Sequence, residues 1–391
     1  EIDACKVSLA GDFYETLVYC DFAENLIPYL KNTVAYDEII WHETNDDGLC
    51  FLEIKAQQFL DENILQEILD MGEVKYIKKL SPVLPVLSRN NLQVPFITSD
   101  EMLAYNQDKK LSLWELAIDY ECMRGNISRE EVFEKMRSIV RIMRNAIDTG
   151  LKGTSYPDRI LGSQSVQLKE QLTNKRLMGG DVNNTIIMYV SAIMEVKSSM
   201  GVIVAAPTAG SCGALPGAII GMATSLDLSE DEIVKAMLAA GLIGVFVAAH
   251  ATFAAEVGGC MAECGSGSGM AAAALVGMAN GSLAQSLSAA SLALQNVLGL
   301  ICDPIGNRVE APCLGRNVMA ATNAVSCANM ALSDYNHLVP LDEVIETMQK
   351  VGNEIHHTLR CTNLGGLSIT KAAKAIEQQL ENQPQSFFKI C

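Results

Sequence analysis

The feature that most limits the fold is a series of long apolar stretches, rich in alanine and glycine, that fill the chain from about residue 96 onwards and lack the alternation typical of strands. Such stretches predict packed helices. They are interrupted by Gly, Pro or Asp, and three cysteines lie at the interruptions: Cys260, Cys302 and Cys313. Helix ends are places where a helical protein can present thiols to an interior cavity, so these three are the first candidates for a site.

The N-terminal part has a different pattern. Residues 1–95 predict a small α/β domain that ends in a linker at 81–95 containing Pro82, Pro85 and Pro95. The fold class is therefore α+β: a small N-terminal α/β domain followed by a large all-helical domain over 96–391. The expected elements of the first domain are a strand at Gly48–Ile54, a helix at Phe59–Met71 and a strand at Val74–Ile77.

Helix starts in the second domain are indicated by capping residues. Thr98, Ser128, Ser229 and Asp342 each stand where a helical pattern begins. The polar stretch 149–181 predicts a break between helices, either a plain connecting loop or a mobile lid over a site.

Composition excludes several classes of function. The formal net charge of −17 argues against nucleic acid and against an anionic membrane surface. Twelve cysteines without a visible secretory leader predict a cytoplasmic protein in a reducing compartment. Three apolar runs are expected to be buried helices and not membrane spans, because they contain prolines or a histidine or are too short. These runs are Val202–Met222, Gly241–Val257 and Ala289–Ile301.

The three cysteines are far apart in the sequence, with spacings of 302 − 260 = 42 and 313 − 302 = 11 residues. The short Cys-x-x-Cys pairs typical of zinc sites are absent among them. Iron–sulfur clusters accept thiolates from separate segments, and three thiolates would leave one iron open. The alternative is that these are buried cysteines packed as small apolar residues.

The loop from Pro207 to Pro216 has the composition of an anion site. Gly210, with Gly213 and Gly217, lets backbone N–H groups approach a ligand, and Thr208 and Ser211 add hydroxyl donors. A helix that opens at Pro216-Gly217 would favour a carboxylate at its N-terminus. The alternative is a tight helix–helix connection that needs small residues.

Polar residues close to the cysteines in the sequence are further candidates. Arg316 and Asn317 follow Cys313, and Arg316 could hold a carboxylate with two hydrogen bonds or form a salt bridge within the fold. Glu263 follows Cys260 and could take part in proton transfer or in orienting an amino group, or it could cap a helix.

Three segments together resemble the iron–sulfur L-serine dehydratases. They are Ala205–Gly217, Ala255–Cys260 with Glu263, and above all Cys302–Asn317, which reads Cys-Asp-Pro-Ile-Gly-Asn-Arg-Val-Glu-Ala-Pro-Cys-Leu-Gly-Arg-Asn. The resemblance covers about 96–391, the family's catalytic α portion, and begins near Phe96–Leu103.

The resemblance implies a [4Fe-4S] cluster held by Cys260, Cys302 and Cys313, with L-serine as a small amino-acid substrate. It implies that the C-terminal Cys391 can occupy the open iron until substrate displaces it, and that the protein is a homodimer. The family's N-terminal Ser-Ser-His-Thr segment is absent from residues 1–95, so the usual histidine is missing. We therefore consider His250, ten residues before Cys260, as the base, with His356-His357 as a second candidate.

Other functions remain open at this stage. L-cysteine desulfidation to pyruvate, ammonia and sulfide would use the same open iron with a thiolate leaving group. A non-catalytic sensor that uses the cluster as a switch is a second class. A third is a subunit that needs a separate partner to complete its site, unless residues 1–95 are a diverged remnant of that partner.

Overall fold

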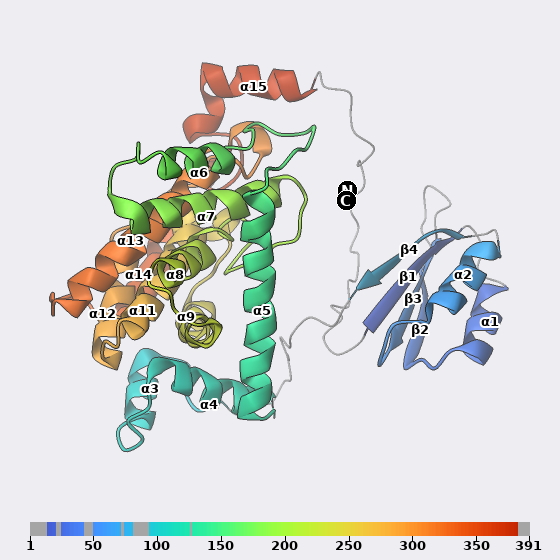
Figure 1. The fold of residues 1–391 in the computed structure, drawn as a ribbon, viewed down its shortest axis with the longest axis horizontal. Coiled ribbons are helices and arrows are strands. Elements are labelled where there is room, and N and C mark those ends of the chain that lie inside the picture. Colours follow the sequence, from blue (N-terminus) through green and yellow to red (C-terminus); the bar gives the residue numbers. More distant parts are fainter. Residues whose placement is uncertain are drawn as a thin grey trace. The chain divides into compact units, whose positions relative to one another are not determined.

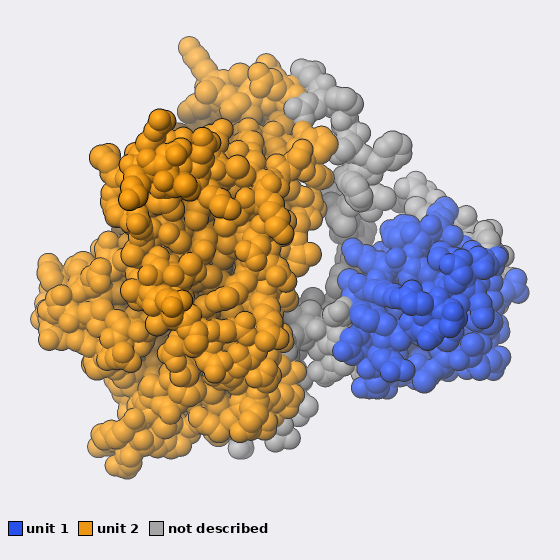
Figure 2. Space-filling view, viewed as in Figure 1, with its two compact units in different colours: residues 1–92 blue, residues 93–391 orange. Residues whose placement is uncertain are grey.

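The computed structural model describes residues 14–20, 25–42, 50–71, 74–80, 94–125 and 127–381. The chain divides into two compact units, residues 1–92 and 93–391, which are coloured separately in Figure 2. The predicted ligand Cys391 lies outside the described residues.

The first unit is a four-stranded antiparallel sheet with two helices on one face (Figure 1). The spatial order of the strands is β2-β3-β1-β4, and β1 pairs with both β3 and β4. The predicted strands and helix of this unit are present, with slightly shifted ends. The elements are β1 (Tyr14–Cys20), α1 (Leu26–Thr33), β2 (Glu38–His42), β3 (Cys50–Ala56), α2 (Glu62–Asp70) and β4 (Val74–Leu80).

The core of this unit lies between the sheet and its helices. Val18, Leu52 and Ile54 on the central strands are fully or almost fully buried against Leu30 of α1 and Ile68 of α2. Alternate residues of the same strands point to the opposite face. There the rings of Tyr19 and Phe51 stack on each other at 5.4 Å.

The second unit is helical, and its described residues contain no strand beyond an isolated bridge between Cys302 and Arg360. This confirms an α+β chain that is mostly helical. The long helices are α3 (Ser99–Tyr105), α4 (Leu113–Gly125), α5 (Arg129–Gly150), α6 (Ser165–Thr173), α7 (Gly180–Ser198), α8 (Ala214–Ser225), α9 (Glu230–His250), α11 (Ser266–Met278), α12 (Leu283–Gln295), α13 (Cys313–Leu332), α14 (Leu341–Glu354) and α15 (Lys371–Glu381). The short elements are α10 (Ala255–Gly258), the π-helical turn η1 (Met261–Gly265), η2 (Ile305–Asn307), η3 (His357–Leu359) and η4 (Gly366–Ile369).

Helices α9 and α11 form the centre of this unit. Every residue of α11 from Ser266 to Val276 is buried, and the helix packs against α8, α9, α12 and α13. Helix α9 is long and apolar enough to cross a membrane by length and composition, but 67% of its most apolar window is buried inside the protein. Phe246 of α9 is completely buried, which fits the role of a core helix.

Two helices that carry the candidate site approach each other through glycine. A Cβ atom placed on Gly217 of α8 would lie 2.4 Å from Val190 Cγ2 and 3.0 Å from Val190 N on α7. One turn later, a Cβ on Gly221 would lie 3.0 Å from the Cα of Ile186. The absence of side chains at these positions therefore sets the distance between α7 and α8.

Most of the predicted caps are present. The side chains of Thr98, Ser128 and Ser229 accept hydrogen bonds from the N–H groups of residues 101, 131 and 232. Asp342 differs from the prediction: its carboxylate accepts from Ser99 N and Asp100 N, so it caps α3 and not its own helix. The carboxylate lies close enough to another helix start to satisfy N–H groups there.

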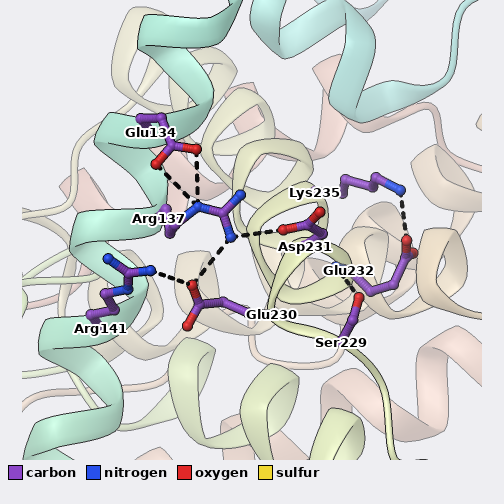
Figure 3. Close-up of polar contacts among 8 residues, drawn as sticks. All are labelled: Glu134, Arg137, Arg141, Ser229, Glu230, Asp231, Glu232 and Lys235. Atoms are coloured by element: carbon purple, nitrogen blue, oxygen red, sulfur yellow. Dashed lines mark hydrogen bonds and ion pairs between the residues drawn. The ribbon is translucent and has the colours of Figure 1, made fainter.

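Helix α9 begins in a network of ion pairs with α5 (Figure 3). Arg137 of α5 bridges Glu230 and Asp231 at distances of 3.1 and 2.7 Å, and Arg141 contacts Glu230 at 3.0 Å. Acidic residues in the first turn of a helix also interact favourably with its dipole. The network therefore fixes the end of α9 that is remote from the cysteines.

Two expectations about helix limits need correction. The polar stretch 149–181 contains a helix of its own, α6, whose start is held by Glu195: this buried carboxylate accepts from Gln164 N at 2.7 Å and Ser165 N at 2.9 Å. Helix α8 begins at Ala214 and not at Pro216, because Asn317 satisfies the N–H groups of Gly213 and Ala214.

A pair of glycine substitutions tests the α7–α8 approach. We expect Gly217→Ala to lower the free energy of unfolding by about 1–3 kcal/mol, because the new methyl overlaps Val190. The matched control is Gly241→Ala in α9, where no atom lies within 4 Å of a new Cβ; it should stabilise by up to about 1 kcal/mol through helix propensity. Urea unfolding followed by circular dichroism measures both, and a Gly217→Ala variant as stable as Gly241→Ala would contradict the close approach.

Candidate active site

Backbone contacts bring the segments of two predicted ligands together. Cys260 follows α10, and the next residue, Met261, donates from its N–H to Leu300 O at 3.0 Å. Gly259, which lies between α10 and Cys260, has φ of 70°. A Cβ on this residue would lie 2.7 Å from Leu300 O, so only glycine permits this approach. Cys302 lies two residues after Leu300 and is therefore next to Cys260.

A third segment lies on the other side of Cys302. Cys302 N donates to Leu359 O at 2.8 Å, and Cys361 N donates to Cys302 O at 2.8 Å. These bonds place Cys361, which the sequence analysis did not single out, beside a predicted ligand. Cys361 itself has φ of 61°, a value uncommon for a residue other than glycine.

The thiols form a row. The ligand atoms of Cys260, Glu263 and Cys302 all lie within 4.8 Å of one another. Cys264 is close enough to Cys260 to shift its pKa, and Cys361 is close enough to Cys302 to do the same. The order along the row is therefore Cys264, Cys260, Cys302 and Cys361.

The third predicted ligand, Cys313, is the first residue of α13 and is buried. It interacts electrostatically with Cys260. The structure thus brings Cys260 and Cys302 together directly and puts Cys313 within range of the charge of Cys260.

The thiols differ in charge. Hydrogen bonds from Cys264 and Cys302, together with the charge of Arg316, hold the pKa of Cys260 well below its usual range. The pKa of Cys302 is raised because its thiol donates to Cys260, and burial raises the pKa of Cys313 to about 12. Among the three predicted ligands, Cys260 therefore loses its proton most easily. Because metal ligation requires thiolates, loading a metal group would release protons.

Arg316 is the cation that accompanies this thiolate. Its Nη1 lies 3.5 Å from Cys260 Sγ, and its Nη2 pairs with the buried carboxylate of Asp303. Asp303 also accepts from Leu367 N at 2.7 Å. A substrate contact of Arg316 stays a prediction; in this structure its guanidinium holds the Cys260 thiolate.

Asn317 organises the predicted substrate loop. Its Oδ1 accepts from Gly213 N at 3.2 Å and Ala214 N at 3.0 Å. Its Nδ2 donates to Gly210 O at 2.8 Å and Cys313 O at 2.9 Å. The side chain is completely buried and its main hydrogen-bonding groups are occupied. The geometry therefore favours a positioning role for Asn317, and a direct substrate contact stays a prediction.

The loop meets the cysteines at Glu263. Thr208 Oγ1 donates to Glu263 Oε1 at 2.7 Å and lies 3.0 Å from Ser211 Oγ. A Cβ on Gly210 would lie 2.7 Å from the same carboxylate oxygen. Burial raises the pKa of Glu263 to about 7, and the nearby Cys260 thiolate adds to this effect. The Glu263 carboxyl group is therefore next to both the loop and the thiols, and it can gain or lose a proton near neutral pH.

The sequence analysis missed Lys197 in the last turn of α7. Its Nζ donates to Val309 O, between two predicted ligands. Burial lowers its pKa, while the nearby Cys212, Cys313 and Glu263 oppose that shift. The feature of the sequence that could have indicated it is a lysine at the end of an apolar helix.

Cys264 could also have been predicted from the sequence, because its spacing from Cys260 is Cys-x-x-x-Cys. No sequence feature indicated Cys361.

The histidine candidates are placed differently. His250 is the last residue of α9, and its Nε2 lies 3.0 Å from Ile97 O. Among the described contacts, none joins His250 to Cys260, Glu263 or Thr208. His356 and His357 are exposed, on the segment that leads to Cys361. The assignment of the base to any histidine stays a prediction.

The donor set fits an iron–sulfur cluster. Thiolates are the soft ligands that such clusters take, and the site offers several buried thiols and a compensating arginine. The π-helical turn η1 directly after Cys260 is of a kind frequently found at functional sites. Together these features define a helical domain with a buried, thiol-rich site suited to a metal cofactor.

Comparison with known proteins gives the family. Residues 108–368 match the model of the serine dehydratase alpha chain, and the chain belongs to this family. It is 35% identical over 280 residues to the probable L-serine dehydratase, alpha chain, of Bacillus subtilis (strain 168), covering 72% of this chain and 93% of that protein. It is 34% identical over 282 residues to the L-serine dehydratase, alpha chain, of Peptoniphilus asaccharolyticus, covering 72% and 97%.

A longer relative is matched in part. The L-serine dehydratase of Streptomyces coelicolor (strain ATCC BAA-471 / A3(2) / M145) is 34% identical over 293 residues, which are 73% of this chain and 63% of that protein. The resemblance inferred from the cysteine segments is thereby confirmed.

The raised pKa of Glu263 predicts a pH effect on the stability of the cluster-free protein. Between pH 4.5 and about 7 the folded state keeps a proton that the unfolded state releases, so the free energy of unfolding falls as pH rises. The shift corresponds to at most about 3 kcal/mol. Glu263→Gln should remove this decline, as measured by urea unfolding at several pH values. The control Glu256→Gln, at an exposed neighbouring carboxylate, should keep it; equal profiles for the two variants would contradict the assignment.

Proposed function

We propose that this chain is an iron–sulfur-dependent L-serine dehydratase that converts L-serine to pyruvate and ammonia. The observation that carries the proposal is the direct contact between the Pro207–Pro216 loop and the thiol row through Glu263. The proposal is supported by the family and by the L-serine dehydratase activity for which the relatives are named. A cytoplasmic location, a homodimer and a tail function for Cys391 stay predictions.

The proposed cofactor is a [4Fe-4S] cluster held by Cys260, Cys302 and Cys313. When bound, it would supply a Lewis-acidic iron for the β-hydroxyl of the substrate. The chain's own residues prepare this site: Arg316 balances the charge of Cys260, and Asn317 ties the first turn of α13, which carries Cys313, to the loop. In this proposal the Pro207–Pro216 loop binds the substrate, and Glu263 transfers the proton.

Elimination of water requires a base for the Cα proton and a proton for the leaving oxygen. Glu263 is suited to accept and donate these protons, because its pKa of about 7 lets it change protonation state near neutral pH. Thr208 donates to its carboxylate and so orients it. Ser211 and Gly210 lie beside it on the loop, where the substrate carboxylate would bind. Lys197 adds positive charge on the side of Cys313. The released aminoacrylate hydrolyses to pyruvate and ammonia.

Replacing single cysteines tests the ligand set. We expect Cys260→Ala, Cys302→Ala and Cys313→Ala each to lose most of the roughly four irons per chain that a cubic cluster contains. Iron and acid-labile sulfide are measured after anaerobic reconstitution, together with pyruvate formation from L-serine. The matched control is Cys327→Ala, a buried cysteine further along α13, which should keep its iron. A cluster retained in any of the three variants would remove that residue from the set.

The substrate assay separates the alternative functions. Pyruvate and ammonia from L-serine, measured anaerobically in the reconstituted protein, support dehydration. Sulfide released from L-cysteine at a higher kcat/KM than pyruvate from L-serine would favour desulfidation. A protein that carries the cluster and acts on neither substrate would favour a sensor or a subunit that needs a partner.

Two substitutions distinguish the candidate bases. Glu263→Gln should lower kcat by about 100-fold or more while the iron content stays unchanged, because general base catalysis is lost. His250→Asn should keep most of its turnover, since His250 is bonded to Ile97 O and not to the loop. The reverse outcome, an active Glu263→Gln and an inactive His250→Asn with full iron, would restore His250 as the base.

A further inference from the structure

One thiol of the row is not used by the proposed mechanism. Cys361 packs against the small apolar cluster formed by Ala255, Cys260 and Cys302. It is joined to Cys302 by a direct backbone hydrogen bond of 2.8 Å, which places the two cysteines side by side. The neighbouring bond from Cys302 N to Leu359 O holds the two segments in parallel. Two cysteines held side by side in this way satisfy the proximity that a disulfide needs.

Access from solvent differs along the row. Cys260 and Cys264 are each 1% exposed and Cys302 is 2% exposed, whereas Cys361 is only half-buried. Its neighbour Thr362 is exposed. A small oxidant therefore meets Cys361 before it meets the other three thiols.

We propose that Cys361 is the oxidant-reactive thiol of this site and that, in the cluster-free protein, it forms a reversible disulfide with Cys302 when it meets a hydroperoxide. The Cys361 thiolate attacks the peroxide, breaks the O–O bond and becomes a sulfenic acid, with hydroxide as the leaving group. The Cys302 sulfur then displaces the sulfenic oxygen, and the S–S bond forms. In sum, two thiols and one hydrogen peroxide give one disulfide and two water molecules: the thiols are oxidised and the peroxide is reduced.

The chemistry of the pair supports this order of events. Cys361 is the half-buried member of the pair whereas Cys302 is 2% exposed, so a peroxide reaches the Cys361 sulfur first. A sulfenic acid next to a thiol condenses to a disulfide before further oxidation to a sulfinic acid, which is normally irreversible. Among the described cysteines, Cys302 is the one bonded through its backbone to Cys361.

The consequence rests on the proposed function, because Cys302 is a predicted cluster ligand. Once it is in a disulfide, the chain cannot take up a cluster until a dithiol reduces the bond. The pair would thus protect a ligand from irreversible oxidation while the site is empty of iron.

The experiment uses the full chain, prepared without iron under anaerobic conditions and treated with one equivalent of hydrogen peroxide. Free thiols are alkylated, and the disulfide is mapped by mass spectrometry after proteolysis. We expect a peptide pair joining Cys302 to Cys361. Iron and sulfide uptake should fall at least about fivefold and return to the untreated level after dithiothreitol.

Two variants complete the test. Cys361→Ser should form no disulfide at Cys302, and its loss of iron uptake after peroxide should not be reversed by dithiothreitol. Cys122→Ser, at another half-buried cysteine on α4, should behave as the unchanged protein. Each treated sample is compared with its own untreated sample.

Several outcomes would overturn the proposal. They are a disulfide that joins Cys302 to Cys260 or Cys391 in place of Cys361, a sulfinic acid at Cys361 without any disulfide, or peroxide protection that persists in Cys361→Ser. The mapped disulfide does not depend on the cluster. A Cys302–Cys361 disulfide in a protein that never takes up iron would therefore support the pair while contradicting the proposed cofactor.

Discussion

The site depends on the ability of the fold to keep one thiolate charged inside a mostly apolar interior. Burial alone would disfavour the charge of Cys260. Arg316 offsets this cost, and Asp303 in turn holds the arginine. Asp303 also accepts from Leu367 N, so the turn η4 is tied to the same charge. A buried charge without partners would be strongly destabilising, and this constraint explains why segments so far apart in sequence converge here.

The second organising contact is the side-chain amide of Asn317. It occupies the N–H groups at the start of α8 and the carbonyl oxygens of Gly210 and Cys313. One side chain therefore links the loop to the first turn of α13. The loop also contacts Glu263 through Thr208. A movement of Cys313 would therefore reach the Glu263 carboxyl group through Asn317 and the loop.

Local patterns in the sequence were sufficient for much of the fold. Small apolar residues without strand alternation indicated the helices, and Thr98, Ser128 and Ser229 marked helix starts because a cap acts within three residues. The cap of Asp342 was assigned to the wrong helix because its partners are more than 240 residues away.

The site was predictable only where its residues lie near the cysteines in sequence. Glu263 follows Cys260 by three residues, and the sequence singled it out as a candidate. Lys197 and Cys361 were not found, because their places next to Val309 and Cys302 come from tertiary packing alone. Arg316 and Asn317 were found as residues, but their bonding partners were not predicted. The spacing of residues in the sequence predicts which side chains are neighbours on one helix. The partners of a buried charge or amide come from other segments of the chain, so that spacing does not predict them.

The bond between His250 and Ile97 has a consequence for how the helical unit can be separated from the rest of the chain. Residues 97 to 100 are fastened at two points, by the C-terminal end of α9 through His250 and by α14 through Asp342. This short stretch is therefore an integral part of the helical unit and closes the end of α9 that leads to Cys260. An excised version of this unit must begin upstream of residue 97, since a later start would leave the imidazole and the carboxylate without their backbone partners.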